Sequence, residues 1–349
     1  MEVSTQLEIF EKSSIAFSMP KLVHVRENLY ACVFSVMKIL PARYIIEQGI
    51  KRGEIKSNTT IVATSSGTFA LGVAMVCREL GLKFVIFGDP AIDEHLYRKL
   101  KLLGGEIVIV TNPSIPGSYQ HLRLKALHQY LQDNPNSFWM RQYDNPDNSK
   151  SYEALGRLIV EKLGKNLVLV GSVGSGGSTG GTIRGMRTYH PGIPLIGVDT
   201  FNSVLFGQPN GIRQLRGLGN TLLPKNVSHS LYDEIHWVCA SDAYHNTLEL
   251  LEKACLFCGP TSGAAYQVAA YKAKSDPANQ YVFIAPDEGY RYQDTVYNEA
   301  WRSQQDFYRP TTTLKPQQVD HPRDAVGTWC AFHWGRRTYE EVLELSYHE

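Results

Sequence analysis

Residues 167–181, with the sequence LVLVGSVGSGGSTGG, decide the fold. The first seven residues form the mostly apolar run of a buried strand, and glycine occupies five of the eight positions that follow. A glycine-rich turn between a strand and a helix lets backbone N–H groups converge on an anion, and the helix N-terminus adds the positive end of its dipole. The hydroxyls of Ser175 and Ser178 can donate to the same anion. The stretch therefore predicts a phosphate-binding turn in an α/β protein.

The turn alone does not identify the phosphate-bearing ligand that it binds. A P-loop requires Gly-Lys-Ser/Thr, and the turn contains no lysine. A dinucleotide site requires GxGxxG, but Thr179 stands where a third glycine is expected after Gly174 and Gly176. Asp199, at the end of the next predicted strand, stands where such a site places its acidic residue. A nucleotide-binding oxidoreductase therefore stays open as an alternative.

Strands and helices alternate on both sides of the turn. Apolar strands separated by helices predict parallel sheets that are covered on both faces. The polar stretch 132–148 is expected to be rich in loops, and the alternation stops after residue 305. Residues 307–349 are then predicted to be an extension that packs on the body or on a partner chain. The predicted helices are 42–52, 70–80, 93–103, 152–163, 180–189, 243–255 and 262–273, and the predicted strands are 60–63, 83–87, 106–111, 167–173, 194–199 and 281–285.

Composition restricts the class of protein. The 349 residues predict two domains at about 100–200 residues each. Lys plus Arg number 35 and Asp plus Glu 34, so the net charge of +1 predicts neither a nucleic-acid partner nor a membrane surface. No apolar run approaches the ~20 residues of a membrane helix. Residues 1–12 lack the basic start and apolar centre of a signal peptide, and the six scattered cysteines favour a reducing cytoplasm.

The cysteines and histidines predict no metal site. Cys255 and Cys258 form a lone CxxC without a second pair of ligands, so we interpret them as two small apolar residues near a helix end.

Two further turns carry hydroxyl groups into the start of a helix. Ser65, Ser66, Gly67 and Thr68 lie between a predicted strand and a predicted helix, a position that suits a carboxylate. Thr261 lies in a similar turn, where its hydroxyl could hydrogen-bond a pyridine nitrogen. Each turn alone is explained as well by simple capping of the helix that follows.

Lys38 lies between apolar residues just before a predicted helix. Desolvation in such surroundings lowers the pKa of a lysine, and the neutral amine can then form a Schiff base. Considered alone, Lys38 is better explained as a surface lysine with its stem packed on apolar neighbours.

These four elements, in this order, resemble the cysteine synthase branch of the fold-type II enzymes that carry pyridoxal 5'-phosphate (PLP). Segments 38–47, 199–207 and 286–292 are similar to a part of that family that works in siderophore biosynthesis. The resemblance implies a tryptophan synthase β-like fold, with two parallel-sheet domains and the cofactor in the cleft between them. It implies these limits: 1–40 plus 157–306 for a large PLP-binding domain, 41–156 for a small domain that binds the substrate carboxylate, and 307–349 for a C-terminal extension.

The resemblance also implies a role for each element. Lys38 would hold PLP as an aldimine and act as the acid–base group, and Thr261 would face the pyridine nitrogen. The segment 32–36 departs from the family's Asn-Pro-Gly-Gly-Ser, and Thr68 replaces the asparagine that contacts the PLP 3-hydroxyl. The phosphate would be held by Gly174, Ser175, Gly176, Gly177 and Ser178, and the substrate carboxylate by Ser65, Ser66, Gly67, Thr68 and Gln142.

The implied activity is β-replacement on an activated serine, O-phosphoserine or O-acetylserine, through an aminoacrylate. An amine such as that of glutamate would be the nucleophile, and the protein would be a cytoplasmic homodimer with small amino-acid substrates. A cysteine synthase or a β-eliminating lyase of the same fold remains an alternative. So does a non-catalytic PLP-fold protein that binds a partner through residues 307–349.

Overall fold

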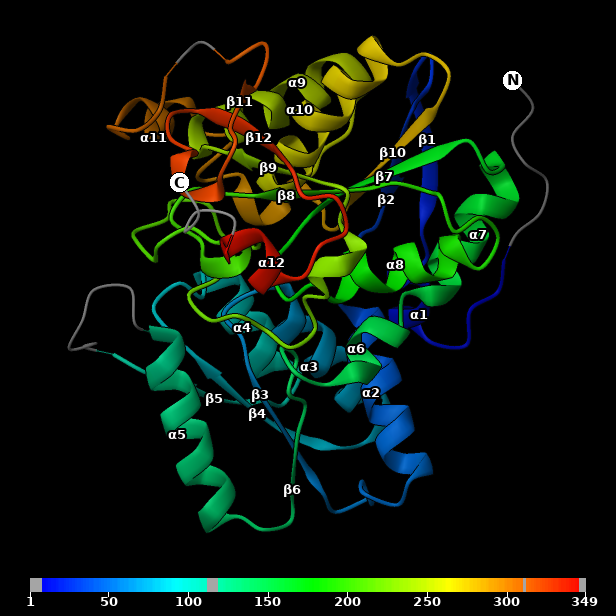
Figure 1. Cartoon of the computed structure of the whole chain (residues 1–349). Coiled ribbons are helices and arrows are strands. Elements are labelled where there is room, and N and C mark those ends of the chain that lie inside the picture. The colour runs from blue at the N-terminus through cyan, green and yellow to red at the C-terminus, as the bar shows by residue number, and fades with distance from the viewer. Residues whose placement is uncertain (1–7, 112–118, 310–311, 345–349) are drawn as a thin grey trace.

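The computed structural model describes residues 8–111, 119–309 and 312–344. Parts of the N-terminal stretch 1–12 and of the extension 307–349 lie outside these ranges. Within them, the chain forms two sheets with helices on both faces (Figure 1). The α/β architecture with parallel strands that the sequence predicts is therefore confirmed.

The larger sheet consists of β1 (Lys21–Arg26), β2 (Leu29–Val33), β7 (Leu167–Ser172), β8 (Leu195–Asp199), β9 (Glu234–Val238), β10 (Gln280–Ala285), β11 (Gln317–Gln318) and β12 (Trp329–His333). Their spatial order is β1-β2-β10-β7-β8-β9-β12-β11. Neighbours from β2 to β9 run parallel, whereas β1 pairs antiparallel with β2 and β12 pairs antiparallel with β9. The parallel centre of the sheet is thus flanked on each side by an antiparallel strand.

Both faces of this sheet are buried. The helices that cover it are α7 (Glu153–Leu163), α8 (Gly177–Arg187), α9 (Ala240–Ala254) and α10 (Pro260–Ser275). Successive strand residues point to opposite faces, so Leu169 packs in the core with α7 and α8 while Val170 packs in the core with α9 and α10 (Figure 1). Burial on both faces explains why the strands are apolar at consecutive positions.

The smaller sheet consists of β3 (Thr60–Thr64), β4 (Lys83–Gly88), β5 (Glu106–Ile109) and β6 (Ser137–Trp139), with the order β5-β4-β3-β6 and all pairs parallel. One face packs against α2 (Ile39–Lys51), α3 (Thr68–Leu80) and α4 (Glu94–Leu102). The other face packs against α5 (Tyr119–Asp133), at the lower left of Figure 1. This sheet lies in the chain between β2 and β7 of the larger sheet.

Short helices complete the described chain. None of its helices combines the length and the apolar character needed to cross a membrane. The short α-helices are α1 (Ser13–Ser18), α6 (Pro146–Lys150), α11 (Glu299–Ser303) and α12 (Tyr339–Glu344), and the 3₁₀ helices are η1 (Val204–Phe206), η2 (His229–Leu231), η3 (Gly289–Tyr292) and η4 (Pro322–Asp324).

Several helices begin earlier than the sequence predicts. We expected helix starts at residues 42, 180 and 243, but α2 begins at Ile39, α8 at Gly177 and α9 at Ala240. The first N–H groups of a helix have no partner within it, so glycine and proline are tolerated there and do not mark a boundary.

The stretch 132–148, expected to be rich in loops, contains β6 and the start of α6. Its short strand is stabilised by backbone pairing with β3, a partner that local sequence does not reveal.

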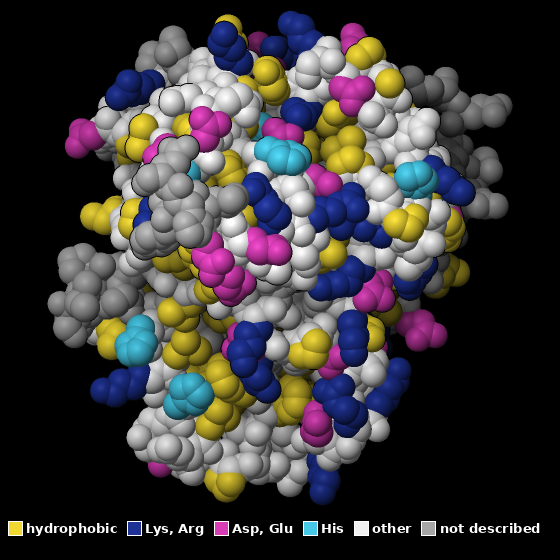
Figure 2. All heavy atoms as spheres, in the orientation of Figure 1, with side chains coloured by type: hydrophobic (Ala, Val, Ile, Leu, Met, Phe, Trp, Pro, Cys, Tyr) yellow, Lys and Arg dark blue, Asp and Glu magenta, His cyan; other side chains and the backbone are white. Residues whose placement is uncertain are grey.

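Charged side chains of both signs are interspersed on the face of the molecule in Figure 2. This mixture of signs agrees with the net charge of +1.

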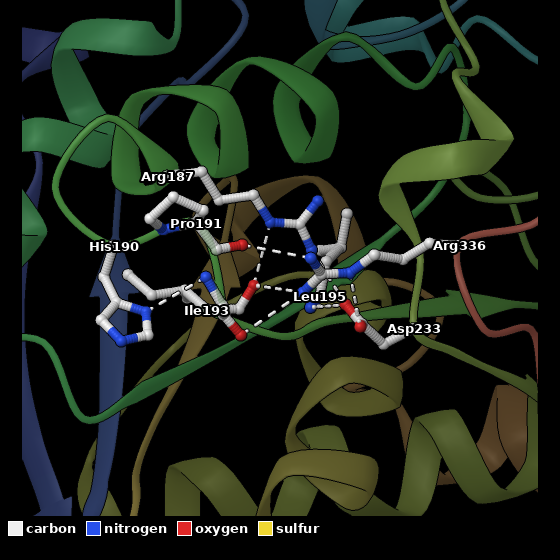
Figure 3. Close-up of polar contacts among 8 residues, drawn as sticks. Arg187, His190, Pro191, Ile193, Leu195, Asp233 and Arg336 are labelled. Carbon is white, nitrogen blue, oxygen red and sulfur yellow. Dashed lines mark hydrogen bonds and ion pairs between the residues drawn. The ribbon is translucent and has the colours of Figure 1, made fainter.

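Arg336, in the segment after β12, fastens the extension to the body (Figure 3). Its Nε donates to Asp233 Oδ1 at 2.7 Å, and its terminal nitrogens donate to the carbonyl oxygens of residues 191–193. The other carboxylate oxygen of Asp233 accepts from Arg187 at 2.9 Å and from the N–H of Leu195 at 2.8 Å. One carboxylate therefore joins β8, α8 and the C-terminal segment.

We predict that Arg336→Ala lowers the free energy of unfolding by about 1–3 kcal/mol, because it removes the charged hydrogen bond to the partly buried Asp233 carboxylate. Urea denaturation measures this loss. Arg323→Ala, on an exposed side chain of the same C-terminal extension but before β12, is the control and should change stability by less than about 0.5 kcal/mol. Equal effects of the two variants would contradict the anchoring role.

Candidate active site

The turns singled out in the sequence gather at the carboxyl ends of parallel strands. Lys38 follows β2, the turn 65–67 follows β3, and the glycine turn 174–176 follows β7. Thr261 opens α10, and the bridge between Cys258 and Glu288 holds the start of that helix beside the end of β10. Ligands of α/β proteins bind at such strand ends.

The position of Lys38 is fixed by backbone pairing on one side and by close packing on the other. The N–H of Phe34 donates to Ala285 O at 2.9 Å. The N–H of Met37 donates to Pro286 O at the same distance. On the other side, α3 approaches so closely that a Cβ on its Gly72 would lie 2.7 Å from the Lys38 carbonyl oxygen.

The amine of Lys38 is suited to nucleophilic chemistry. Desolvation lowers the pKa of Lys38 to about 8, against the opposing charge of the Asp287 carboxylate. A lysine with a pKa near 8 is partly neutral at neutral pH, and the neutral amine is the form that adds to a carbonyl. Lys38 is half-buried in the structure, between the chain that follows β10 and helix α3.

The glycine turn leaves its backbone bare toward the site. Gly176 has φ +78° and N-caps α8, and a Cβ there would lie 2.7 Å from the Asn226 carbonyl oxygen. Both the left-handed backbone and the lack of space exclude a side chain at this position. Ser175 and Ser178 flank Gly176 and are buried. The turn has the geometry of an anion site at a helix N-terminus.

Gln142 joins the turn 65–67 after β3, which we call the carboxylate turn, to the glycine turn 174–176. Its Nε2 donates to Thr64 O at 2.6 Å, directly before Ser65. The backbone carbonyl oxygen of Gln142 accepts from Asn148 Nδ2 at 2.6 Å, and Asn148 lies in contact with Gly177. Ser65, Gln142 and Gly177 therefore surround one region, although they come from different parts of the chain.

Thr261 also lies within this region. Ser172 Oγ, at the end of β7, donates to Thr261 O at 2.8 Å. The methyl group of Thr261 lies 3.0 Å from the place that a Cβ on Gly217 would take. The glycine turn and the start of α10 are thus neighbours, as the resemblance implies.

Arg291 connects the two sheet bodies beside the carboxylate turn. Its Nε and Nη2 donate to Asp93 Oδ2 at 2.9 and 2.7 Å, so η3 is tied to the N-terminus of α4. Its Nη1 lies 3.6 Å from the place that a Cβ on Gly67 would take. This ion pair closes the smaller sheet onto the larger one.

Sequence reasoning missed a buried cation behind the carboxylate turn. Arg123, on α5, donates from Nη1 to Ser66 Oγ at 2.9 Å and pairs with Asp89 at 3.4 Å. Its Nε is buried and has no partner among the described residues. An amphipathic helix over 119–133 would have been the signal, but α5 carries polar residues on most of its faces.

Asp199 does not support a nucleotide site. Its carboxylate is fully buried, and its Oδ1 accepts from the N–H of Thr200 at 2.8 Å. Burial raises the pKa of Asp199 to about 7. The turn itself also lacks the third glycine of a dinucleotide site, because Thr179 stands at that position.

Known proteins resemble the chain over most of its length. N-(2-amino-2-carboxyethyl)-L-glutamate synthase of Ralstonia nicotianae is 35% identical over 268 residues, which cover 76% of this chain and 79% of that protein. The protein of the same name from Cupriavidus metallidurans is 32% identical over 271 residues, covering 76% and 80%.

Solved structures show the same fold. O-acetylserine sulfhydrylase isoform 3 from Entamoeba histolytica has a TM-score of 0.77 at 22% identity and covers 85% of this chain and 94% of its own. The O-acetylserine dependent cystathionine β-synthase from Helicobacter pylori has a TM-score of 0.75 at 25% identity, covering 84% and 100%. The model of a family described as pyridoxal-phosphate dependent enzyme matches residues 22–287. The chain therefore belongs to the family of pyridoxal-phosphate dependent enzymes and has the type II fold of that group.

Proposed function

We propose that the protein catalyses a PLP-dependent β-replacement that joins the three-carbon unit of an activated serine to the amine of a second amino acid such as glutamate. The observation that carries this proposal is Lys38, an amine of lowered pKa that follows β2 at the edge of the sheet where the glycine turn follows β7. The name of the two curated relatives describes this product, a 2-amino-2-carboxyethyl group on the nitrogen of glutamate.

The residues present fit PLP. The turn 174–178 offers N–H groups and hydroxyls to a phosphate, and no side chain intrudes at Gly176. Thr261 brings a neutral hydroxyl to the neighbourhood, where it can hydrogen-bond a pyridine nitrogen. Thr64 Oγ1 and Asn148 Oδ1 are buried without partners among the described residues, and such polar atoms are expected around a ligand site. When bound, PLP supplies an electron sink for the substrate α-carbon.

The chain's own residues bind and orient the serine donor, and they move its α-proton. Ser65, Gly67 and Thr68 offer hydroxyl and backbone donors at the start of α3 to the α-carboxylate of the serine donor, and Gln142 holds that turn through Thr64 O. Lys38 takes the proton from the donor α-carbon and returns it once the new bond has formed. The ion pair between Arg291 and Asp93 keeps the smaller sheet closed, which limits access of water.

The name of the two curated relatives favours an amino-acid amine as nucleophile over sulfide, the nucleophile of a cysteine synthase. Arg123 does not decide this choice, because its guanidinium is already ion-paired with Asp89 and donates to Ser66. A β-eliminating lyase needs no second acceptor at all. A non-catalytic binding protein has no use for a lysine of lowered pKa.

The six cysteines all lie within the described residues and are free, which supports a reducing cytoplasm as part of this proposal. Family membership supports a homodimer. We expect light scattering coupled to size-exclusion chromatography to give twice the mass of the chain. A mass that stays at one chain over a wide concentration range would contradict the dimer.

We predict that the full chain with added PLP shows a visible absorbance band that Lys38→Ala lacks, because the band requires the lysine amine. The exposed Lys56→Ala is the control and should keep the band. O-phosphoserine and O-acetylserine, tested separately, should change the spectrum. With glutamate present, mass spectrometry should detect the new C–N bond, whereas product from sulfide alone would favour a cysteine synthase. A chain that stays colourless with PLP rules the proposal out.

We predict that Gly176→Ala raises the dissociation constant of PLP by at least about tenfold, equivalent to about 1.4 kcal/mol, because the left-handed backbone and the Asn226 carbonyl oppose a methyl group. Fluorescence titration measures the affinity. Gly81→Ala is the matched control, with φ +70° and open space around its Cβ at the end of α3. It should lose some stability but keep its affinity, and equal affinity losses in both variants would count against the phosphate turn.

A further inference from the structure

We propose that Asp287 is a positioning residue that acts through Lys38, its free carboxylate oxygen holding the ammonium form of the lysine during the reaction. This inference rests on the proposed function and deepens it. The amine of Lys38 gains the proton that the donor α-carbon loses, and the electron pair of the broken C–H bond stays with the substrate. Asp287 takes no proton in that step. It fixes the position of the Lys38 ammonium until the proton is returned to the substrate.

The backbone places Asp287 beside the lysine segment. Asp287 forms an antiparallel bridge with Val36, two residues before Lys38, and the N–H of Gly259 donates to the Asp287 carbonyl oxygen at 3.2 Å. The pairing therefore ties three segments together: the chain before α2, the chain after β10 and the chain before α10. Movement of Asp287 away from Lys38 would require these backbone hydrogen bonds to break.

The carboxylate of Asp287 has one engaged oxygen and one free oxygen. The Tyr292 hydroxyl donates to Oδ2 at 2.9 Å. Oδ1 is buried without a partner among the described residues, and the Cα of Gly259 lies so close that a side chain there would overlap it. A buried acceptor without a donor is costly, so Oδ1 calls for a donor in some state of the site. Two cations act on this carboxylate, Arg291 and Lys38. Because Asp93 holds Nε and Nη2 of Arg291, we take the ammonium of Lys38 as the donor to Oδ1.

Charged and titratable groups surround Asp287 from each packed element. Lys38 and Arg291 are cations, and Glu288 is the neighbouring acid, engaged by Ser35 Oγ at 2.8 Å. The groups that interact with Asp287 are Lys38 from α2, Cys258 before α10, Glu288, Arg291 and Tyr292 at η3, and Tyr297 before α11. Lys38 is the only one of these described groups that the proposed reaction protonates and deprotonates.

The acid–base balance of the pair suits this role. Burial raises the pKa of Asp287 to about 6, and the Tyr292 hydroxyl, Arg291 and Lys38 limit the rise. The pKa of Lys38 is about 8. The pair is therefore charged between about pH 6 and pH 8. Below that window Asp287 becomes neutral, and above it Lys38 becomes neutral.

The test measures the basicity of Lys38 in the full chain before any cofactor is added. Acetic anhydride acylates only neutral amines, so the rate at which the Lys38 peptide gains an acetyl group at each pH, followed by mass spectrometry, gives its pKa. We expect Asp287→Asn to lower that pKa by about one unit or more, as loss of a nearby opposite charge does. Glu288→Gln is the matched control and should leave it unchanged.

Tyr292→Phe provides an independent check should the asparagine variant not fold. It removes the donor to Oδ2, so Asp287 should become neutral at a higher pH and the basicity of Lys38 should begin to fall from there. In the enzyme loaded with PLP, Asp287→Asn should lower kcat at least about tenfold while KM stays within about twofold, because the proton rather than substrate binding is affected. The acid limb of the pH profile should move to lower pH together with the pKa of Lys38.

The outcomes separate this inference from the proposed function. An unchanged labelling profile in Asp287→Asn and in Tyr292→Phe overturns the role of Asp287, even if the β-replacement is confirmed. An equal shift in Glu288→Gln also overturns it, because the effect would then be one of general charge. Full β-replacement activity in Lys38→Ala would instead refute the proposed function, whatever the labelling shows.

Discussion

The pairing of β2 with β10 is the constraint on which the site depends. Ala285 lies opposite Val33 in that pair, so the chain leaving β2 and the chain leaving β10 run on side by side. This continuation carries Lys38 to the edge of the sheet and brings Asp287 alongside it. Because β10 also pairs with β7, the glycine turn that follows β7 opens at the same edge. The lysine and the phosphate turn are thus brought together by sheet register.

The smaller sheet carries the turn 65–67, and a few polar contacts set its distance from the larger sheet. Gln142 links the carboxylate turn to Asn148, and Asn148 reaches the start of α8. Arg291 and Asp93 make the corresponding contact on the other side. The exposed pair of His95 and Asp294, at 3.7 Å, runs beside it and adds little, since both side chains are in solvent. Closure therefore depends mainly on contacts that are partly shielded from water.

The sequence alone predicts the parallel sheets and the phosphate turn, because apolar runs and glycine clusters are local signals. It does not predict β1, which begins and ends with a basic residue at a sheet edge, or β2, whose partner β10 lies about 250 residues further along the chain. Lys38 became a candidate only in combination with the other turns. The sequence did not single out Asp287 or Arg123, because their contacts are with Val36 and Ser66, which are distant in the chain, and residue spacing does not reveal such contacts.

The order of the strands along the chain has a consequence for folding. Leu29 and Tyr281, partners in β2 and β10, are separated by about 250 residues, and pairing between distant segments is slow because the closing loop loses entropy first. The smaller sheet is formed by residues 60–139 and is more local, so we expect it to form earlier. Until β2 and β10 meet, Lys38 is a solvated lysine with the basicity of any other. The chain therefore buries Lys38 late in folding, and the surroundings that lower the pKa of this amine are absent while the chain is still incomplete.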